Sequence, residues 1–234
     1  MNRKRIDLAE IYSRLRKRFG FQDWWPGETK DEIVIGAILT QQASWNNVEK
    51  AIEGLKSAGK LSLRKIARTD TRTLERLIKP SGFYRQKSRR LKGVASYVCE
   101  RYGGLGRLFE KDGESLREEL LSLNGIGEET ADSIALYAAG KPFFVIDAYT
   151  RRAMHRIDPK IPEDTCYDLL RSYFQENLDS DIGLYKDFHA QFVELGKRHC
   201  KTKPVCRGCP LGGLCAYRRQ SVRNLLYLKK AYTE

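Results

Sequence analysis

Helical periodicity runs through the 234-residue sequence and leaves room for few folds other than a helical bundle. Apolar residues recur at intervals of three and four, and no segment alternates apolar and polar residues between hairpin turns. Short connections rich in Gly, Pro, Ser and Asn separate the segments. The sequence therefore predicts a compact, nearly all-α protein. The expected helices are Leu8–Phe19, Asp31–Gln41, Asn46–Ala58, Thr71–Ile78, Gln86–Arg101, Ser115–Leu123, Glu128–Ala139, Ala148–Arg156, Glu163–Glu176 and Gly183–Arg198.

The composition indicates a globular, basic protein. Hydrophobic residues make up 41% of the chain, which is enough for a buried core in one domain or two small ones. Lys and Arg total 43 against 30 Asp and Glu, and the net charge of +13 favours a polyanionic partner, with nucleic acid first. Basic residues that only solvate helix faces are the alternative. No apolar run approaches the length of a membrane span, so we expect a soluble protein with no membrane partner.

Four of the six cysteines are clustered near the C-terminus, on a stretch interrupted by prolines and glycines. Without a secretory signal, such a cluster indicates metal ligation before disulfides. Four soft ligands with the central pair two residues apart suit either tetrahedral zinc or a [4Fe-4S] cluster, and the spacing alone slightly favours zinc. The clustered residues are Cys200, Cys206, Cys209 and Cys215.

A two-glycine hairpin is expected between two helices at Leu123–Ile134. Gly125 and Gly127 permit positive φ and let another backbone approach closely. A DNA phosphate can then meet bare amides at the start of the second helix, where the macrodipole favours an anion. Glycine pairs are also common in ordinary helix connections, so the pair alone leaves phosphate binding and a plain turn both open.

An apolar stretch, Phe143–Ile146, delivers Asp147 to the start of the next expected helix. Because Asp commonly caps helix N-termini, a plain cap is the first interpretation of this residue. The hairpin and the aspartate together, however, resemble the helix-hairpin-helix, Gly/Pro-Asp (HhH-GPD) signature of the endonuclease III superfamily of DNA glycosylases. The resemblance covers most of the chain and implies double-stranded DNA containing a damaged base as the partner.

The resemblance implies that Asp147 assists departure of the base and is the principal catalytic residue. Cleavage of an N-glycosidic bond develops oxocarbenium character on the sugar. A nearby carboxylate can stabilise that charge while it orients or deprotonates a nucleophile.

The resemblance also bears on strand cleavage. Superfamily members that nick the strand carry a lysine 18 residues before the aspartate, where its amine forms a Schiff base with the sugar; this chain has Glu129 there. Glutamate cannot form that imine, so the resemblance implies a monofunctional glycosylase with water as nucleophile and no AP-lyase activity. Glu129 is the second candidate catalytic residue. Its alternative role is to place a favourable negative charge in the first turn of a helix.

The C-terminal position of the cysteines resembles the iron-sulfur loop of endonuclease III and its adenine-specific relatives. The resemblance implies a [4Fe-4S] cluster with a structural and DNA-docking role, and zinc stays the alternative. Basic side chains around the loop either contact phosphates or form a solvated face. They are Arg198, Lys201, Lys203, Arg207, Arg218 and Arg219.

Two tryptophan-bearing segments resemble the 3-methyladenine branch of the superfamily. Large aromatics are usually core, yet a flipped base needs flat apolar walls, and a cationic alkylated purine also gains from indole faces. The expected substrate-binding residues are Trp24, Trp25, Pro26, Trp45 and, near the end of the last long helix, Lys197. The expected DNA-binding residues are Gly125, Gly127 and Gln42, which matches a glutamine that fills the hole left by the extruded base in endonuclease III.

The sequence thus predicts a two-lobed HhH-GPD glycosylase fold with Asp147 facing the cleft between the lobes. Residues 27–138 form one helical lobe with the hairpin; residues 1–26 and 139–234 form the other, with the cluster loop at 199–216. We expect a monomer in the cytoplasm of a prokaryote, associated with the nucleoid through DNA.

The expected function is excision of an alkylated purine such as 3-methyladenine. Alternatives are a mismatch adenine or thymine glycosylase, an oxidised-pyrimidine glycosylase with little lyase activity, and a DNA-binding protein without chemistry in which Asp147 is only a cap.

Overall fold

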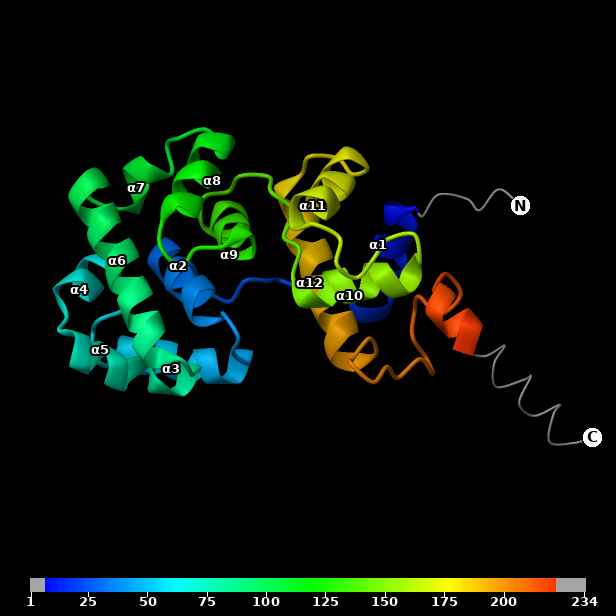
Figure 1. The fold of residues 1–234 in the computed structure, drawn as a ribbon, viewed down its shortest axis with the longest axis horizontal. Helices are drawn as coiled ribbons and strands as arrows, with labels where there is room; N and C mark the ends of the chain where they lie inside the picture. Colours follow the sequence, from blue (N-terminus) through cyan, green and yellow to red (C-terminus); the bar gives the residue numbers. More distant parts are fainter. Residues whose placement is uncertain (1–6, 222–234) are drawn as a thin grey trace, which may run out of the picture. The chain divides into compact units, whose positions relative to one another are not determined.

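The computed structural model describes residues 7–221, and the regular elements in this range are all helical (Figure 1). The chain separates into two compact units. The central unit spans Trp25–Phe143, and the terminal unit joins the residues up to Trp24 to those from Phe144 onward. The predicted all-α fold is confirmed. No helix of the described range is long and apolar enough to cross a membrane.

The terminal unit contains one helix from before the central unit and three from after it. These are α1 (Leu8–Phe19), α10 (Ala148–Ile157), α11 (Tyr167–Glu176) and α12 (Ile182–Arg198). The central unit contains α2 (Lys30–Leu39), α3 (Trp45–Ser57), α4 (Leu63–Arg68), α5 (Thr71–Ile78), the 3-10 turn η1 (Lys79–Ser81), α6 (Tyr84–Tyr102), α7 (Leu105–Leu108), α8 (Gly113–Ser122), α9 (Glu128–Ser133) and the π-helical segment η2 (Ile134–Ala138).

Three features differ from the expected helices. The expected helix from Glu163 begins only at Tyr167, because Thr165 turns the chain by donating its amide and hydroxyl to the carbonyl of Pro162, at 3.2 and 2.6 Å. The expected α-helix to Ala139 widens into η2, where the amide of Ala139 bonds the carbonyl of Ile134. The short helices α4 and α7 were not expected. A capping serine and buried apolar residues three apart could have indicated α4.

α2 lies at the centre of the central unit. Its residues Val34–Leu39 are all buried, and the helix packs against α3, α6 and η2. A helix that is apolar on every side is stable only inside a protein, and each large side chain there contributes about 1.5–3 kcal/mol by burial. Because α2 is packed in this way, the positions at which the loops at its two ends join the helix are fixed.

A buried lysine ties the end of α2 to η1. Lys87 is 1% exposed, and its Nζ donates hydrogen bonds to the carbonyls of Leu39 and Ser81, at 2.7 and 2.6 Å. Burial, with a smaller contribution from the charge of Arg90, lowers the pKa of Lys87 to about 8. One ammonium group thus satisfies two carbonyls that the ends of neighbouring elements leave without helical partners.

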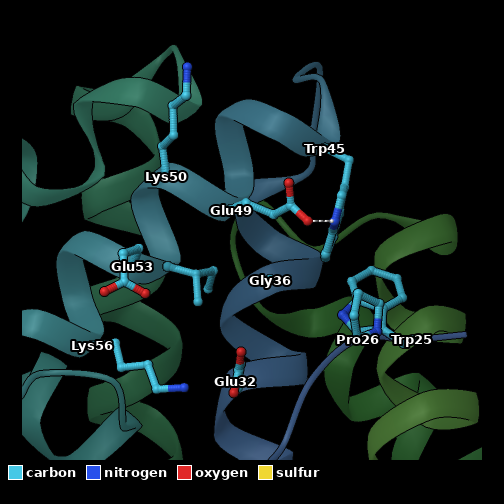
Figure 2. Close-up of a pocket in the computed structure, with 10 residues that line it drawn as sticks. Trp25, Pro26, Glu32, Gly36, Trp45, Glu49, Lys50, Glu53 and Lys56 are labelled. Atoms are coloured by element: carbon cyan, nitrogen blue, oxygen red, sulfur yellow. Dashed lines mark hydrogen bonds between the residues drawn. The ribbon is translucent and has the colours of Figure 1, made fainter.

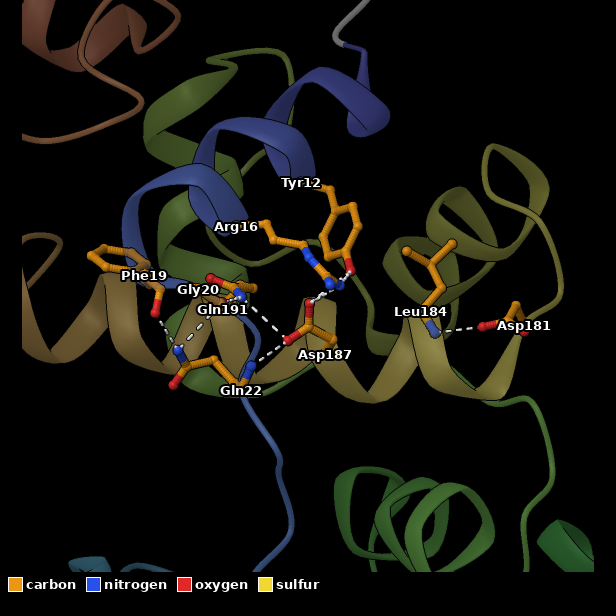
Figure 3. Close-up of polar contacts among 9 residues, drawn as sticks. All are labelled: Tyr12, Arg16, Phe19, Gly20, Gln22, Asp181, Leu184, Asp187 and Gln191. Carbon is orange, nitrogen blue, oxygen red and sulfur yellow. Dashed lines mark hydrogen bonds and ion pairs between the residues drawn. The ribbon is translucent and has the colours of Figure 1, made fainter.

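The terminal unit is organised around a second buried charge, Asp187 on α12 (Figure 3). Its carboxylate is 1% exposed and accepts hydrogen bonds from Tyr12 Oη, Arg16 Nη1, the amide of Gln22 and Gln191 Nε2. Burial and the hydrogen bond to Asp187 together raise the pKa of the Tyr12 hydroxyl. These bonds fasten α1 and the segment that follows it to α12.

Replacing Lys87 by Met should lower the free energy of unfolding by about 1–3 kcal/mol, because two buried carbonyls lose their donor. The loss should grow with pH. The folded protein releases the Lys87 proton near pH 8 and the unfolded chain only near 10.5, so between these values the unfolded state holds more protons and the wild type gains stability as pH rises.

Denaturant titrations at several pH values check this prediction, with Arg89→Met as the control because Arg89 is an exposed cation on the same helix. A difference between wild type and Lys87→Met that stays constant or shrinks as pH rises through this window would contradict it.

Candidate active site

Asp147 is the N-cap of α10. The preceding residues Phe143–Ile146 are buried, and Asp147 itself is extended, with φ −88° and ψ 177°. Its Oδ1 accepts the amide of Thr150 at 2.7 Å, which satisfies one of the free amides at the helix start. The cap interpretation is therefore correct, and it leaves Oδ2 available for another contact.

That second contact is with His189 on α12, whose Nε2 lies 3.6 Å from Asp147 Oδ2. Both residues are nearly buried, at 4% and 9% exposure. Burial alone would raise the pKa of Asp147, but the nearby imidazole of His189 and the hydrogen bond from the Thr150 amide outweigh it and hold that pKa below its ordinary value. Asp147 is thus a carboxylate kept ionised where little water reaches it.

Sequence reasoning gave His189 no role. Its place in an apolar part of α12, among Phe188, Phe192 and Val193, is the one available signal, since a histidine inside a buried helix needs a polar partner. The sequence alone could not identify Asp147 as that partner.

The hairpin lies in the central unit, between α8 and α9. Gly125 has φ +86°, and a Cβ there would come within 2.4 Å of the Arg90 side chain. Gly127 is extended, with φ −96°, so it does not use the positive φ that a glycine permits. A Cβ on Gly127 would meet nothing within 4 Å, which leaves its surroundings open to another molecule.

Gln41 connects the hairpin to the loop that follows α2. Its Nε2 donates to the carbonyl of Gly125 and to Thr130 Oγ1, at 2.9 and 3.0 Å, while Arg90 Nη1 donates to Gln41 Oε1 at 2.5 Å. The next residue, Gln42, is exposed and has φ +52°. Such strained backbone persists only where surrounding structure holds it, and it is typical of functional sites.

Phe83, just after η1, shares this conformation. It has φ +43° and is 61% exposed, and within residues 7–221 it and Gln42 are the non-glycine residues with positive φ. The carbonyls held by Lys87 belong to the segments that lead into Gln42 and Phe83. Sequence reasoning gave Phe83 no role of its own, although its position after Pro80 and Gly82 marked a turn.

Glu129 is exposed in the first turn of α9, beside Glu128. This agrees with the favourable placement of acidic residues at a helix N-terminus. Glu129 belongs to the central unit and Asp147 to the terminal unit.

A pocket of about 510 Å³ opens in the central unit, and three of the expected substrate-binding residues line it (Figure 2). They are Trp25, Pro26 and Trp45. The two indole rings meet edge to face, with centroids 5.4 Å apart and an interplanar angle of 86°. Tyr137 of η2 packs on the ring of Trp25 at 5.2 Å, and a Cβ on Gly36 would lie 3.4 Å from Trp25 Nε1. Glycine at this position therefore lets the ring lie close against α2.

The other two expected substrate-binding residues lie together in the terminal unit. Lys197 Nζ is 5.1 Å from the centroid of the Trp24 ring, which is a cation–π distance. Lys197 also pairs with Glu194 on the same helix at 3.3 Å. The expected residues therefore form two groups, one in each unit.

Two arginines of α10 hold the start of the cysteine loop. Arg156 donates to Cys200 Sγ at 3.3 Å and to the carbonyls of Lys201 and Thr202, and Arg152 donates to the carbonyl of Cys200 at 2.7 Å. The helix that begins at Asp147 thus also supports this loop.

The four cysteines of the loop are half-buried, and their thiols lie close enough to interact electrostatically. Burial raises the pKa of the Cys209 and Cys215 thiols, and the neighbouring thiols raise it further. In the range 7–221, however, no group of three or more His, Cys, Asp or Glu side chains is arranged to hold a metal ion. Four cysteine thiols are suitable ligands for an iron-sulfur cluster or a zinc ion, but in the described residues they are not arranged around a common metal position.

Comparison with known proteins gives the family. Residues 35–175 match the model of the HhH-GPD superfamily of base excision DNA repair proteins, and the chain belongs to that superfamily. A protein of Methanocaldococcus jannaschii provisionally named a DNA repair glycosylase is 45% identical over 210 residues, which cover 89% of this chain and 95% of the relative. Endonuclease III of Thermotoga maritima is 31% identical over 229 residues, covering 93% and 98%.

Solved structures agree with this result. The H. pylori 3-methyladenine DNA glycosylase bound to 1,N6-ethenoadenine is 28% identical, with a TM-score of 0.72 over 82% of this chain and 98% of that one. A non-covalent endonuclease III–DNA complex has a TM-score of 0.79 at 22% identity, over 92% and 97%, and shows the fold. The expected superfamily is confirmed, and with it the coarse function, a DNA glycosylase of base excision repair.

Replacing His189 by Gln should raise the pKa of Asp147. The ionised carboxylate would still be poorly solvated, but it would lose the stabilising contact with His189. NMR titration of the Asp147 carboxyl carbon measures this pKa directly. His155→Gln is the matched control, since His155 lies on α10 and bonds the carbonyl of Ile161. A pKa that is unchanged or lower in His189→Gln would refute the assigned role of the histidine.

Proposed function

We propose that the chain is a monofunctional DNA glycosylase that hydrolyses the N-glycosidic bond of an alkylated purine such as 3-methyladenine. The observation that carries the proposal is the ionised, nearly buried carboxylate of Asp147 between the start of α10 and His189. A negative charge fixed in a poorly solvated place interacts strongly with positive charge that develops on a sugar, and it needs no reorganisation at the moment of reaction.

In this mechanism each carboxylate oxygen of Asp147 has its own function. Oδ1 is held by the Thr150 amide, which fixes the side chain. Oδ2 faces His189 and provides the charge that stabilises the oxocarbenium-like sugar and orients the attacking water. The glycosidic electron pair leaves with the base, the water oxygen bonds to the sugar carbon, and the water proton passes to the carboxylate or to solvent.

The absence of strand cleavage is part of the proposal and rests on Glu129. Its carboxylate cannot form the imine that a lysine amine forms, so water remains as the nucleophile. Glu129 is also an exposed first-turn residue of α9, and its proposed catalytic contribution is secondary to that of Asp147.

The aromatic pocket supports a purine-sized substrate. Trp25, Pro26 and Trp45 line one cavity with flat apolar walls, on which an extruded base can stack. We propose that Trp24 and Lys197 also contact the base or its neighbours. The H. pylori glycosylase that resembles this chain over most of its length is named for 3-methyladenine, which supports the same substrate class here.

We propose that the central unit contacts the DNA backbone and fills the gap left by the extruded base. Gln42 presents its side chain from strained, exposed backbone, and the open surroundings of Gly127 give a phosphate access to amides beside Gly125. The net charge of +13 supports duplex DNA as the partner. The monomeric state and the location at the nucleoid in a prokaryotic cytoplasm stay predictions.

We further propose that Cys200, Cys206, Cys209 and Cys215 hold a [4Fe-4S] cluster, with zinc as the alternative. Four thiols on one loop are the donor set that either group needs. When bound, the cluster would cross-link the loop that Arg152 and Arg156 already anchor to α10.

Asp147→Asn should lower base release from methylated duplex DNA by about 100- to 10,000-fold, because Asn lacks the negative charge. Asn also caps helices well, so the fold and DNA affinity should be retained. Chromatography of the released base identifies 3-methyladenine. Undiminished release by Asp147→Asn would leave the residue as a cap only.

The main rival is excision of mismatched or oxidised bases, since the relatives include enzymes named thymine-DNA glycosylase and endonuclease III. Duplexes with single defined lesions separate these substrates. Borohydride treatment should trap no covalent complex with this chain, and a trapped complex would show that it also forms a Schiff base with the sugar.

Purified protein should contain about four iron atoms per chain and show the visible absorption of an iron-sulfur cluster, both of which Cys206→Ser should reduce. Cys166→Ser is the control, since Cys166 is exposed and lies outside the loop. About one zinc atom per chain, with no visible absorption, would favour the alternative metal.

A further inference from the structure

Glu49 contacts the wall of the aromatic pocket through its carboxylate oxygen Oε1, to which the proposed reaction mechanism assigns no role. It lies one turn after Trp45 on α3, and Trp45 Nε1 donates a hydrogen bond to Glu49 Oε1 at 2.8 Å (Figure 2). The bond satisfies the polar edge of the indole and fixes the plane of the ring that faces Trp25 edge to face.

We propose that Glu49, through this hydrogen bond, makes the pocket selective for bases that carry a positive charge. The inference rests on the proposed function and names the substrate class within it. A carboxylate that accepts the indole N–H polarises the ring and makes its face more negative, and a cation over an indole face is attracted by that negative charge.

The charges around the pocket favour the same ligand. Three glutamates and two lysines line it, in a chain whose net charge is +13. Lys56 is paired with Glu28 at 3.3 Å, and Lys50 points away from the indoles in Figure 2. The carboxylate of Glu49 is a charged group in direct contact with the aromatic wall.

The proposal fixes the kinetic step at which Glu49 acts. A cationic base loses its charge as the glycosidic electron pair moves onto it, and the positive charge passes to the sugar. Glu49 consequently stabilises the bound substrate more than the transition state, so its effect should lie in KM and not in kcat.

Glu49→Gln tests this with little change of shape, because the Gln oxygen can still accept the indole N–H. With duplexes that carry 7-methylguanine, a cationic base, KM should rise about two- to fivefold while kcat is unchanged or slightly higher. With the neutral base 1,N6-ethenoadenine, both constants should stay as in the wild type. Glu100→Gln is the matched control, since it removes the same charge from an exposed position of the central unit that does not line the pocket.

If Glu49→Gln raised KM equally for the two lesions, or lowered kcat, the proposal would be overturned. A wild-type protein that releases neither base would instead count against the proposed function. In that case quenching of tryptophan fluorescence decides on Glu49: in mildly acidic buffer, 7-methylguanosine should bind more tightly than guanosine, and Glu49→Gln should remove the difference. Equal binding of the two nucleosides by the wild type would overturn the inference as well.

Discussion

The ionised carboxylate of Asp147 is the interaction on which the proposed chemistry depends. Removing a carboxylate from water costs free energy, and an isolated one would take up a proton. Here the Thr150 amide and His189 supply the compensation, one from the start of α10 and one from α12. The packing of α10 against α12 therefore does more than bury apolar surface, because it creates the surroundings in which this charge persists.

α10 connects this charge to the cysteine loop. Its first turn is capped by Asp147, and its later turns carry Arg152 and Arg156, which bond the loop backbone around Cys200. A single rigid helix thus relates the position of the carboxylate to that of the loop. An iron-sulfur cluster in such a place would contribute to the order of the active site without taking part in the reaction.

Local patterns were predictable from the sequence, and contacts between distant residues were not. Asp147 was identified as a helix cap because its position after an apolar stretch is visible in the chain, whereas its partner His189 comes from a helix that only the fold brings near. The glycine pair permits positive φ at both positions, but only the fold decides where it is used: Gly125 adopts it and Gly127 does not. The π-helical η2 has the same composition as an ordinary helix, so tertiary packing and not propensity decides its form.

The two hydrogen bonds that Lys87 donates, to the carbonyls of Leu39 and Ser81, have a consequence for local opening of the protein. The one ammonium group of Lys87 bonds the segments that lead into Gln42 and Phe83, which lie on separate loops. Neither loop can detach from its carbonyl contact without disturbing the group that holds the other. We therefore expect the two loops to open together, so that hydrogen exchange of their amides follows a single opening event although they are distant in the sequence.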